Sequence, residues 1–146
     1  MSDGDGAVND ALERGLAVRR EVLGAEYVDR SLAAPHELDA AFQRYVTEHC
    51  WGLAWTDDRL SRRERSIATL AITAVLGRME EFRLHLRGAV RNGLTADELA
   101  ALVVQIGVYA GVPAAVSSQR ALRETLLSEE AADGSVAVGA GSSGEA

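Results

Sequence analysis

Apolar residues recur at helical spacing along most of this chain, and no stretch alternates apolar and polar residues as a strand would. Helix start and stop signals divide the pattern into successive segments. The sequence therefore predicts an all-α fold, with a single helical domain of about six helices over residues 9–127. The predicted helices cover roughly residues 9–23, 36–51, 61–76, 78–92, 95–110 and 113–127.

Capping residues mark the ends of these predicted helices. The patterns S-x-x-E at Ser61–Glu64 and T-x-x-E at Thr95–Glu98 are capping boxes, in which the two side chains satisfy backbone N–H groups at a helix start. Pro35 suits the first turn of the second helix. Gly24 follows the first helix, where a glycine commonly ends one.

The two ends of the chain differ in composition from the middle. Residues 128–146 are small, polar and glycine-rich, and residues 1–8 are polar and acidic. Such segments bury too little apolar area to offset the entropy of the ordered chain. We predict that both ends are disordered.

Composition limits the possible partners. The chain has 146 residues and a formal net charge of -7, which argues against nucleic acid and anionic membranes as partners. Cys50 is the only cysteine, so an intrachain disulfide is impossible and a cysteine-ligated metal is not expected. The sequence shows neither a secretory signal nor a run long enough to span a bilayer. We expect a cytoplasmic protein without a metal.

The predicted helix over residues 95–110 is apolar on nearly every side. A helix of this kind must be covered all round. In a short chain the cover can come from a second copy, so we expect a homo-oligomer. A fully central helix in a monomer is the alternative.

The candidate for proton chemistry is a pair four residues apart on the predicted helix 78–92. Glu81 and His85 would face each other across one helical turn. An imidazole titrates near neutral pH and is the commonest proton-transfer group in enzymes. We expect Gly88 to leave open space beside this imidazole. The alternative is an ordinary surface pair.

Two other clusters suggest a binding pocket. Trp51 and Trp55, the only tryptophans, are placed to wall a pocket or to pack in the core. Arg62 and Arg65 lie in a first helical turn, where cations oppose the helix dipole unless they meet an anion. Pairing with nearby surface carboxylates is the alternative.

Gln105 and Tyr109 are polar residues four apart on the apolar helix 95–110. If buried, each needs a hydrogen-bond partner. They either fix helix packing or point a donor into the site.

The chain resembles the carboxymuconolactone decarboxylase family. The similarity spans about residues 18–126 and rests on several motifs in order. These are R-R-E-V-L-G at Arg19–Gly24, C-W-G-L-A-W-T at Cys50–Thr56, R-R-E-R-S at Arg62–Ser66, L-G-R-M-E-E-F-R-L-H-L-R-G-A-V-R-N-G at Leu76–Gly93 and Q-I-G-V-Y-A-G-V-P-A-A at Gln105–Ala115.

This resemblance implies an all-helical fold shared with alkylhydroperoxidase D, assembled as a homo-oligomer, often a hexamer. It also implies a cofactor-independent reaction in the β-ketoadipate pathway of aromatic catabolism. In that reaction 4-carboxymuconolactone, a lactone dicarboxylate, loses carbon dioxide to give 3-oxoadipate enol-lactone. Val116 departs from the pattern, since a polar residue is expected there in closer relatives.

The related peroxidases carry a C-x-x-C pair seven and four residues before the histidine. Here Arg78 and Glu81 occupy those positions, which favours decarboxylation over thiol peroxidase chemistry. A decarboxylase or tailoring enzyme for a related lactone is the nearest alternative. A non-catalytic helical oligomer that binds a small acid is another, and a peroxidase that uses Cys50 alone is a third.

For the decarboxylation, the residues suggest specific roles. His85 would donate the proton or stabilise the oxyanion, and Glu81 would orient the imidazole and favour its protonated form. Substrate-binding roles fall to five other residues. Arg62 and Arg65 would bind the carboxylate that remains after the reaction. Trp51 and Trp55 would exclude water, and Tyr109 is a weaker candidate for a hydrogen bond to the lactone.

Overall fold

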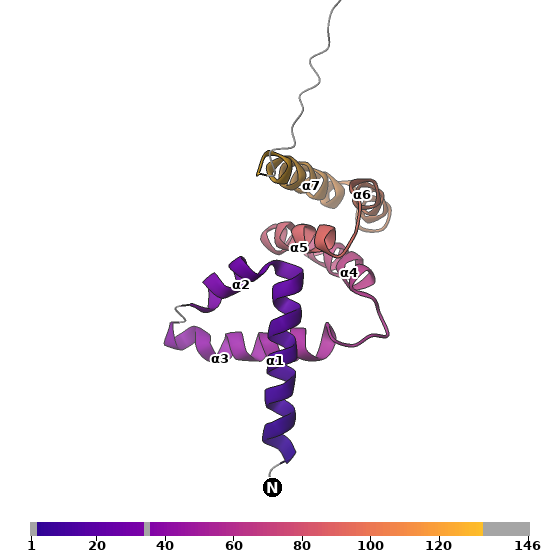
Figure 1. Cartoon of the computed structure of the whole chain (residues 1–146). Coiled ribbons are helices and arrows are strands. Elements are labelled where there is room, and N and C mark those ends of the chain that lie inside the picture. The colour runs from indigo at the N-terminus through magenta and orange to yellow at the C-terminus, as the bar shows by residue number, and fades with distance from the viewer. Residues whose placement is uncertain (1–2, 34–35, 133–146) are drawn as a thin grey trace, which may run out of the picture.

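The computed structural model describes residues 3–33 and 36–132, which are helical over most of their length (Figure 1). The all-α fold class is confirmed, and no strand occurs among the described residues. The elements in order are α1 (Asp3–Leu23), α2 (Ala25–Leu32), α3 (Glu37–Tyr45), the π-helical segment η1 (Val46–Ala54), α4 (Arg62–Val75), α5 (Met79–Arg91), α6 (Ala96–Ala110) and α7 (Val112–Ala132).

The helices form two groups that meet where α1 contacts α5 (Figure 1). The C-terminal bundle consists of α4, α5, α6 and α7, which pack on one another. The N-terminal group consists of α1, α2, α3 and η1, with the continuous α3–η1 rod crossing α1. The junction between the two groups lies next to the predicted site.

The C-terminal bundle has the larger hydrophobic core. Phe82 and Leu86 from α5 meet Leu70 from α4, Leu99 from α6 and Leu122 from α7, and all five are almost fully buried. Both predicted capping boxes are formed at the starts of α4 and α6. The sequence signals for this half therefore match the observed elements.

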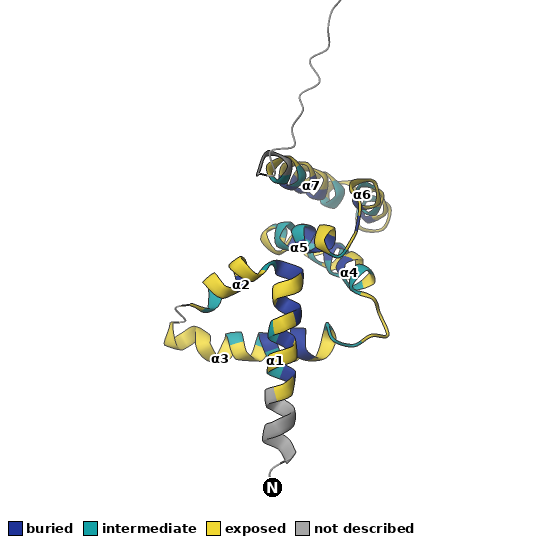
Figure 2. Cartoon of the chain, viewed as in Figure 1, coloured by how far each residue is buried: buried dark blue, intermediate teal, exposed yellow. Residues whose placement is uncertain are grey.

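The N-terminal group is held by a close crossing of two helices rather than by a large core. A Cβ at Gly15 would lie 2.1 Å from the Thr47 carbonyl oxygen, and a Cβ at Gly52 would lie 2.1 Å from the Ala11 carbonyl oxygen. Only glycine allows the backbones of α1 and η1 to come this close. Figure 2 shows dark blue, buried residues at this crossing, whereas α3 is largely exposed.

The observed elements differ from the predicted helices in the N-terminal group. Gly24 ends α1 with φ +93° as expected, but the chain resumes at once as the unpredicted helix α2. Helices of eight residues are marginal alone, and α2 is fixed by packing of its buried Val28. The second predicted helix continues past Trp51 to Ala54 and changes to π geometry at Val46.

The ends of the chain also differ from prediction. α1 begins at Asp3 rather than near Asn9, and α7 continues to Ala132 rather than ending near Leu127. Residues 1–2 and 133–146 lie outside the described residues, as does Pro35. Among the described helices, none is long and apolar enough to cross a membrane.

Candidate active site

His85 lies on α5 at the junction, beside the two tryptophans of the N-terminal group. Its ring centroid is 6.1 Å from that of Trp51 and 6.1 Å from that of Trp55, with interplanar angles of 12° and 15°. The two indoles stack on each other at 5.0 Å. The sequence placed these three residues as separate candidates, and the structure brings them together in one aromatic cluster.

The π geometry of η1 sets the position of both indoles. The Trp55 N–H donates to the Cys50 carbonyl oxygen five residues earlier, at 3.0 Å. Thr47, Trp51 and Gly52 form the buried side of the segment. π-Helical turns are rare and often occur at functional sites. Because Gly52 lets η1 press against α1, Trp51 is buried toward α5.

Burial lowers the pKa of His85 below its ordinary value, because a desolvated imidazole disfavours the charged form. The charge of Glu81 acts in the opposite direction but is the smaller effect. Glu81 thus favours the protonated form of His85, as expected, but burial outweighs it. Glu81 is exposed, and no hydrogen bond joins it to His85 in the described structure.

Gly88 does not leave open space beside the imidazole, contrary to our expectation. It is buried, and a Cβ there would lie 3.0 Å from both Cγ1 and the carbonyl oxygen of Val22. Gly88 therefore lets α1 and α5 approach closely. This contact is one of the features that seat the N-terminal group on the bundle.

A hollow of about 370 Å³ lies beside Trp55, and Arg62 contributes to its wall. Arg62 also pairs with Glu21 of α1, although both side chains remain substantially exposed. The Asn92 side chain donates to Ser66 Oγ at 2.9 Å and so ties the end of α5 to the first turns of α4. An anion in this hollow would meet Arg62 next to the aromatic cluster, although Asp57 and Asp58 also contribute to the wall.

Arg65 faces its own chain rather than open solvent. Its Nη2 donates to the Asp57 carbonyl oxygen at 2.6 Å and lies 3.9 Å from the Asp57 carboxylate. Arg59 bonds to the same carboxylate and, together with Arg65, holds its pKa well below the usual range. Arg65 thus holds the loop after η1 against α4. Its Nε is buried without a partner among the described residues.

Glu81 opens onto a different hollow, of about 270 Å³. Tyr27, Glu80, Leu84 and Arg87 also line it. This hollow lies on the side of α5 that faces α2. The sequence did not predict Tyr27 as a neighbour of Glu81, because it lies on the helix that the pattern missed.

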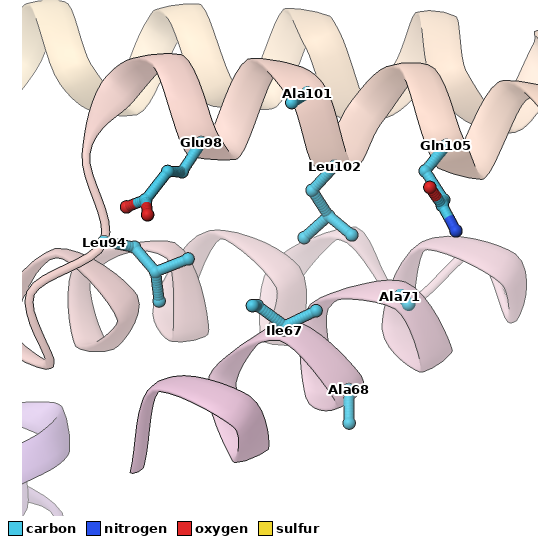
Figure 3. A pocket seen from close by; sticks show the side chains of 8 residues that line it. All are labelled: Ile67, Ala68, Ala71, Leu94, Glu98, Ala101, Leu102 and Gln105. Carbon is cyan, nitrogen blue, oxygen red and sulfur yellow. The ribbon is translucent and has the colours of Figure 1, made fainter. Parts of the chain in front are cut away.

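Tyr109 and Gln105 lie away from the aromatic cluster in the single chain. Tyr109 on α6 is 83% exposed, so its hydroxyl does not reach into the described pocket beside Trp55. Gln105 lines a separate apolar hollow of about 470 Å³ between α4 and α6. Figure 3 shows Gln105 and Leu102 pointing from α6 toward Ile67 and Ala71 on α4.

The class of protein is indicated by a helical fold with a partly buried imidazole packed beside two stacked indoles. The family model described as "Carboxymuconolactone decarboxylase family" matches residues 40–124, which include the whole aromatic cluster. The chain belongs to this family.

Two curated relatives cover most of the chain. The chain is 39% identical over 112 residues to a 4-carboxymuconolactone decarboxylase from Acinetobacter baylyi, with 77% of this chain and 84% of the relative covered. It is 34% identical over 125 residues to a nitrosuccinic acid decarboxylase from Metarhizium robertsii, with 82% and 87% covered. Both relatives are named as decarboxylases, and their named substrates differ.

Proposed function

We propose that this protein is a carboxy-lyase that removes carbon dioxide from 4-carboxymuconolactone and forms 3-oxoadipate enol-lactone. This reaction would place it in the β-ketoadipate pathway of aromatic catabolism. The observation that carries the proposal is His85, a partly buried imidazole of lowered pKa packed beside the stacked pair Trp51 and Trp55. Family membership and the name of the Acinetobacter relative support the choice of reaction.

The substrate itself accepts the electron pair that decarboxylation leaves behind. The departing carboxylate is attached to a ring carbon vinylogous to the lactone carbonyl, so its loss moves the electron pair into a furan-olate. Negative charge then collects on the carbonyl oxygen. The protein has to bind the remaining carboxylate, stabilise this oxygen and deliver a proton to a ring carbon.

His85 stabilises the oxyanion and donates the proton. Its ring offers an N–H as a hydrogen-bond donor to the oxyanion. A bound dicarboxylate brings negative charge beside the ring and raises its pKa, since an opposite charge favours the imidazolium. Glu81 acts in the same direction. The bound substrate therefore favours the imidazolium, whose proton the ring carbon receives.

Trp51 and Trp55 exclude water from one side of the imidazole. A dry environment disfavours the charged carboxylate and favours neutral carbon dioxide, although fixed dipoles must then stabilise the developing charge. Arg62, beside Trp55, is our proposed ligand for the carboxylate that remains. Arg65 supports the same wall through Asp57 and offers its unpartnered Nε.

Nitrosuccinic acid is the second candidate substrate, because the Metarhizium relative is similar over a comparable share of the chain. Its nitro group can accept the electron pair left by an adjacent carboxylate, as the lactone does. Both molecules keep a second carboxylate after the reaction. The same arrangement of His85 and Arg62 would suit either of them.

The test is release of carbon dioxide from freshly generated 4-carboxymuconolactone, with nitrosuccinic acid assayed in parallel. We expect kcat/KM to be higher for the lactone and the product to be the enol-lactone. Turnover of nitrosuccinic acid alone would contradict the proposed substrate but would still support a decarboxylase. Binding of both acids without carbon dioxide release would support the non-catalytic alternative and contradict the proposal.

We also propose that the protein is a homo-oligomer, with a hexamer as the expected form. Large apolar side chains remain exposed on α4, at its C-cap and on α6: Ile72, Val75, Leu76, Val104, Val108 and Tyr109. Exposed apolar patches of this kind are typical of protein interfaces. Tyr109 would then contribute to a site only through a neighbouring copy.

The oligomer is tested by light scattering after size-exclusion chromatography. We expect several chains per particle for the parent, and a lower mass for Val108→Asp, which places a charge in the apolar patch. Arg120→Asp on exposed α7 is the control and should leave the mass unchanged. A monomeric parent at the concentrations used for assay would contradict the proposal.

A further inference from the structure

A buried arginine on α1 has no role in the function proposed above. Arg19 is 6% exposed and lies between α1 and the α3–η1 rod. Its Nη1 donates to Gln43 Oε1 and to Thr47 Oγ1, each at 3.0 Å. Both acceptors are neutral, and the Nε is buried with no hydrogen-bond partner among the described residues.

Arg19 also lacks a carboxylate partner within the described part of the chain. Its neighbour Arg20 pairs with Asp29, and Arg62 pairs with Glu21. Burial lowers the pKa of Arg19, and Tyr27 and Cys50 lie close enough to act weakly in the opposite direction. Buried charges in proteins are normally paired, because an isolated one keeps its desolvation cost. The guanidinium therefore lacks a counter-charge.

The residues that hold Arg19 also line a hollow. Gln43 and Thr47 belong to the wall of a cavity of about 280 Å³. The rest of that wall is mostly apolar and comes from α1, α2 and α3: Leu12, Leu16, Leu32, Ala40 and Arg44. A cavity of about 150 Å³ can hold one benzene molecule, so this hollow has room for a ring with a substituent.

A second hollow near Arg19 has a mixed wall. Tyr27, which also lies near Arg19, lines it together with Glu80, Glu81 and Arg87. The apolar hollow contains no carboxylate in its wall, and Gln43 and Thr47 connect it to Arg19. An anion in the apolar hollow would therefore meet no like charge in its wall.

We propose that this hollow is a binding site for a small monocarboxylic acid with a compact apolar body. The apolar body packs against Leu12, Leu16 and Leu32. The carboxylate takes the place of the Gln43 amide oxygen and accepts from Nη1 of Arg19. Charge-assisted hydrogen bonds of this kind are roughly twice as strong as neutral ones, which favours the exchange. The site stands apart from His85 and does not depend on the proposed reaction.

The experiment is isothermal titration of the full-length protein with benzoate, and with benzamide as the uncharged molecule of the same shape. We expect benzoate to bind one site per chain, and benzamide roughly 10- to 100-fold more weakly, the range that one hydrogen bond to a charged group supplies. Equal binding of the two ligands, or no binding of benzoate at about 10 mM, would overturn the proposal.

Three variants locate the site. Arg19→Met removes the buried charge at similar volume, which is often neutral or stabilising, and should abolish the preference for benzoate. Ala40→Leu fills the hollow from an exposed position and should block binding with Arg19 intact. Arg14→Met, at an exposed arginine of the same helix, should bind as the parent does.

The outcomes are distinct from those of the decarboxylase test. His85→Ala should bind benzoate with unchanged affinity, because His85 is not part of this wall. Loss of benzoate binding in His85→Ala, together with full binding in Ala40→Leu, would place the acid at the aromatic cluster and overturn the second site. Retained benzoate preference in a folded Arg19→Met, judged by circular dichroism, would overturn the role of Arg19.

Discussion

The C-terminal bundle and the N-terminal group are built in different ways, and the candidate active site lies where they meet. In the bundle, four amphipathic helices share one core around Phe82 and Leu86, and capping boxes fix two of their starts. In the N-terminal group, glycines at Gly15 and Gly52 allow backbone contact between α1 and η1. The bundle supplies His85, and the N-terminal group supplies both indoles that pack beside it.

The bundle and the N-terminal group therefore contribute different features to the candidate active site. The imidazole is mounted on the part of the molecule with the deeper core, which suits a group that must keep a fixed position. Its environment depends on a helix crossing that tolerates no added methyl group. Substitutions in the two regions should therefore have different effects. Substitution of His85 in the bundle should lower activity alone, whereas substitutions at the crossing of α1 and η1 should lower both stability and activity.

Loss of the His85 side chain, which the bundle contributes to the junction, should have the largest effect on activity. We expect His85→Ala to lower kcat by roughly 10²- to 10⁴-fold, the usual contribution of a proton-transfer group. His49→Ala is the matched control, because His49 is exposed and stacks only on Tyr45. Carbon dioxide release by the purified variants is the measurement. Equal activity of the two variants would remove His85 from the reaction.

Disturbing the crossing of the N-terminal group should have the next largest effect. Gly52→Ala places a methyl group 2.1 Å from the Ala11 carbonyl oxygen, and we expect it to cost about 3 kcal/mol of unfolding free energy. Gly107→Ala in α6 is the control, since its methyl group would meet only the Ala115 side chain, at 3.1 Å. Urea unfolding measures both, and similar stabilities would show that the crossing is not as tight as described.

The smallest of the three effects concerns substrate binding at the edge of the junction. Arg62→Met should raise KM by about tenfold with little change in kcat, because a substrate carboxylate loses one charged hydrogen bond. Arg59→Met removes a more exposed arginine of the neighbouring loop and should leave KM unchanged. A fall in kcat at constant KM would instead assign Arg62 to the chemical step.

The bundle could be predicted from the sequence because its signals are local. The boxes at Ser61–Glu64 and Thr95–Glu98, and the apolar periodicity between them, define helix starts without knowledge of the rest of the fold. The i, i+4 spacing of Glu81 and His85 was likewise visible. Their electrostatics were not, because the pKa of His85 is set by burial against α1 and η1.

The N-terminal group depends on tertiary contacts that leave no local pattern. Eight residues are too few for α2 to show a clear helical period, and the π turn of η1 has no composition that distinguishes it from an α-helix. Gly15 and Gly88 look like weak points in a helix until the partner backbone is seen. Arg19 looks like one arginine among many, since only the fold reveals that it is buried.

The measurement that tests the central claim most directly is an NMR titration of the His85 ring in the full-length protein, with and without an unreactive saturated analogue of the lactone. We predict a pKa below the ordinary value of about 6.5 in the free protein, and a rise when the dicarboxylate binds. A ring that titrates at or above its ordinary value, and does not respond to the analogue, would contradict a buried imidazole facing an anionic substrate.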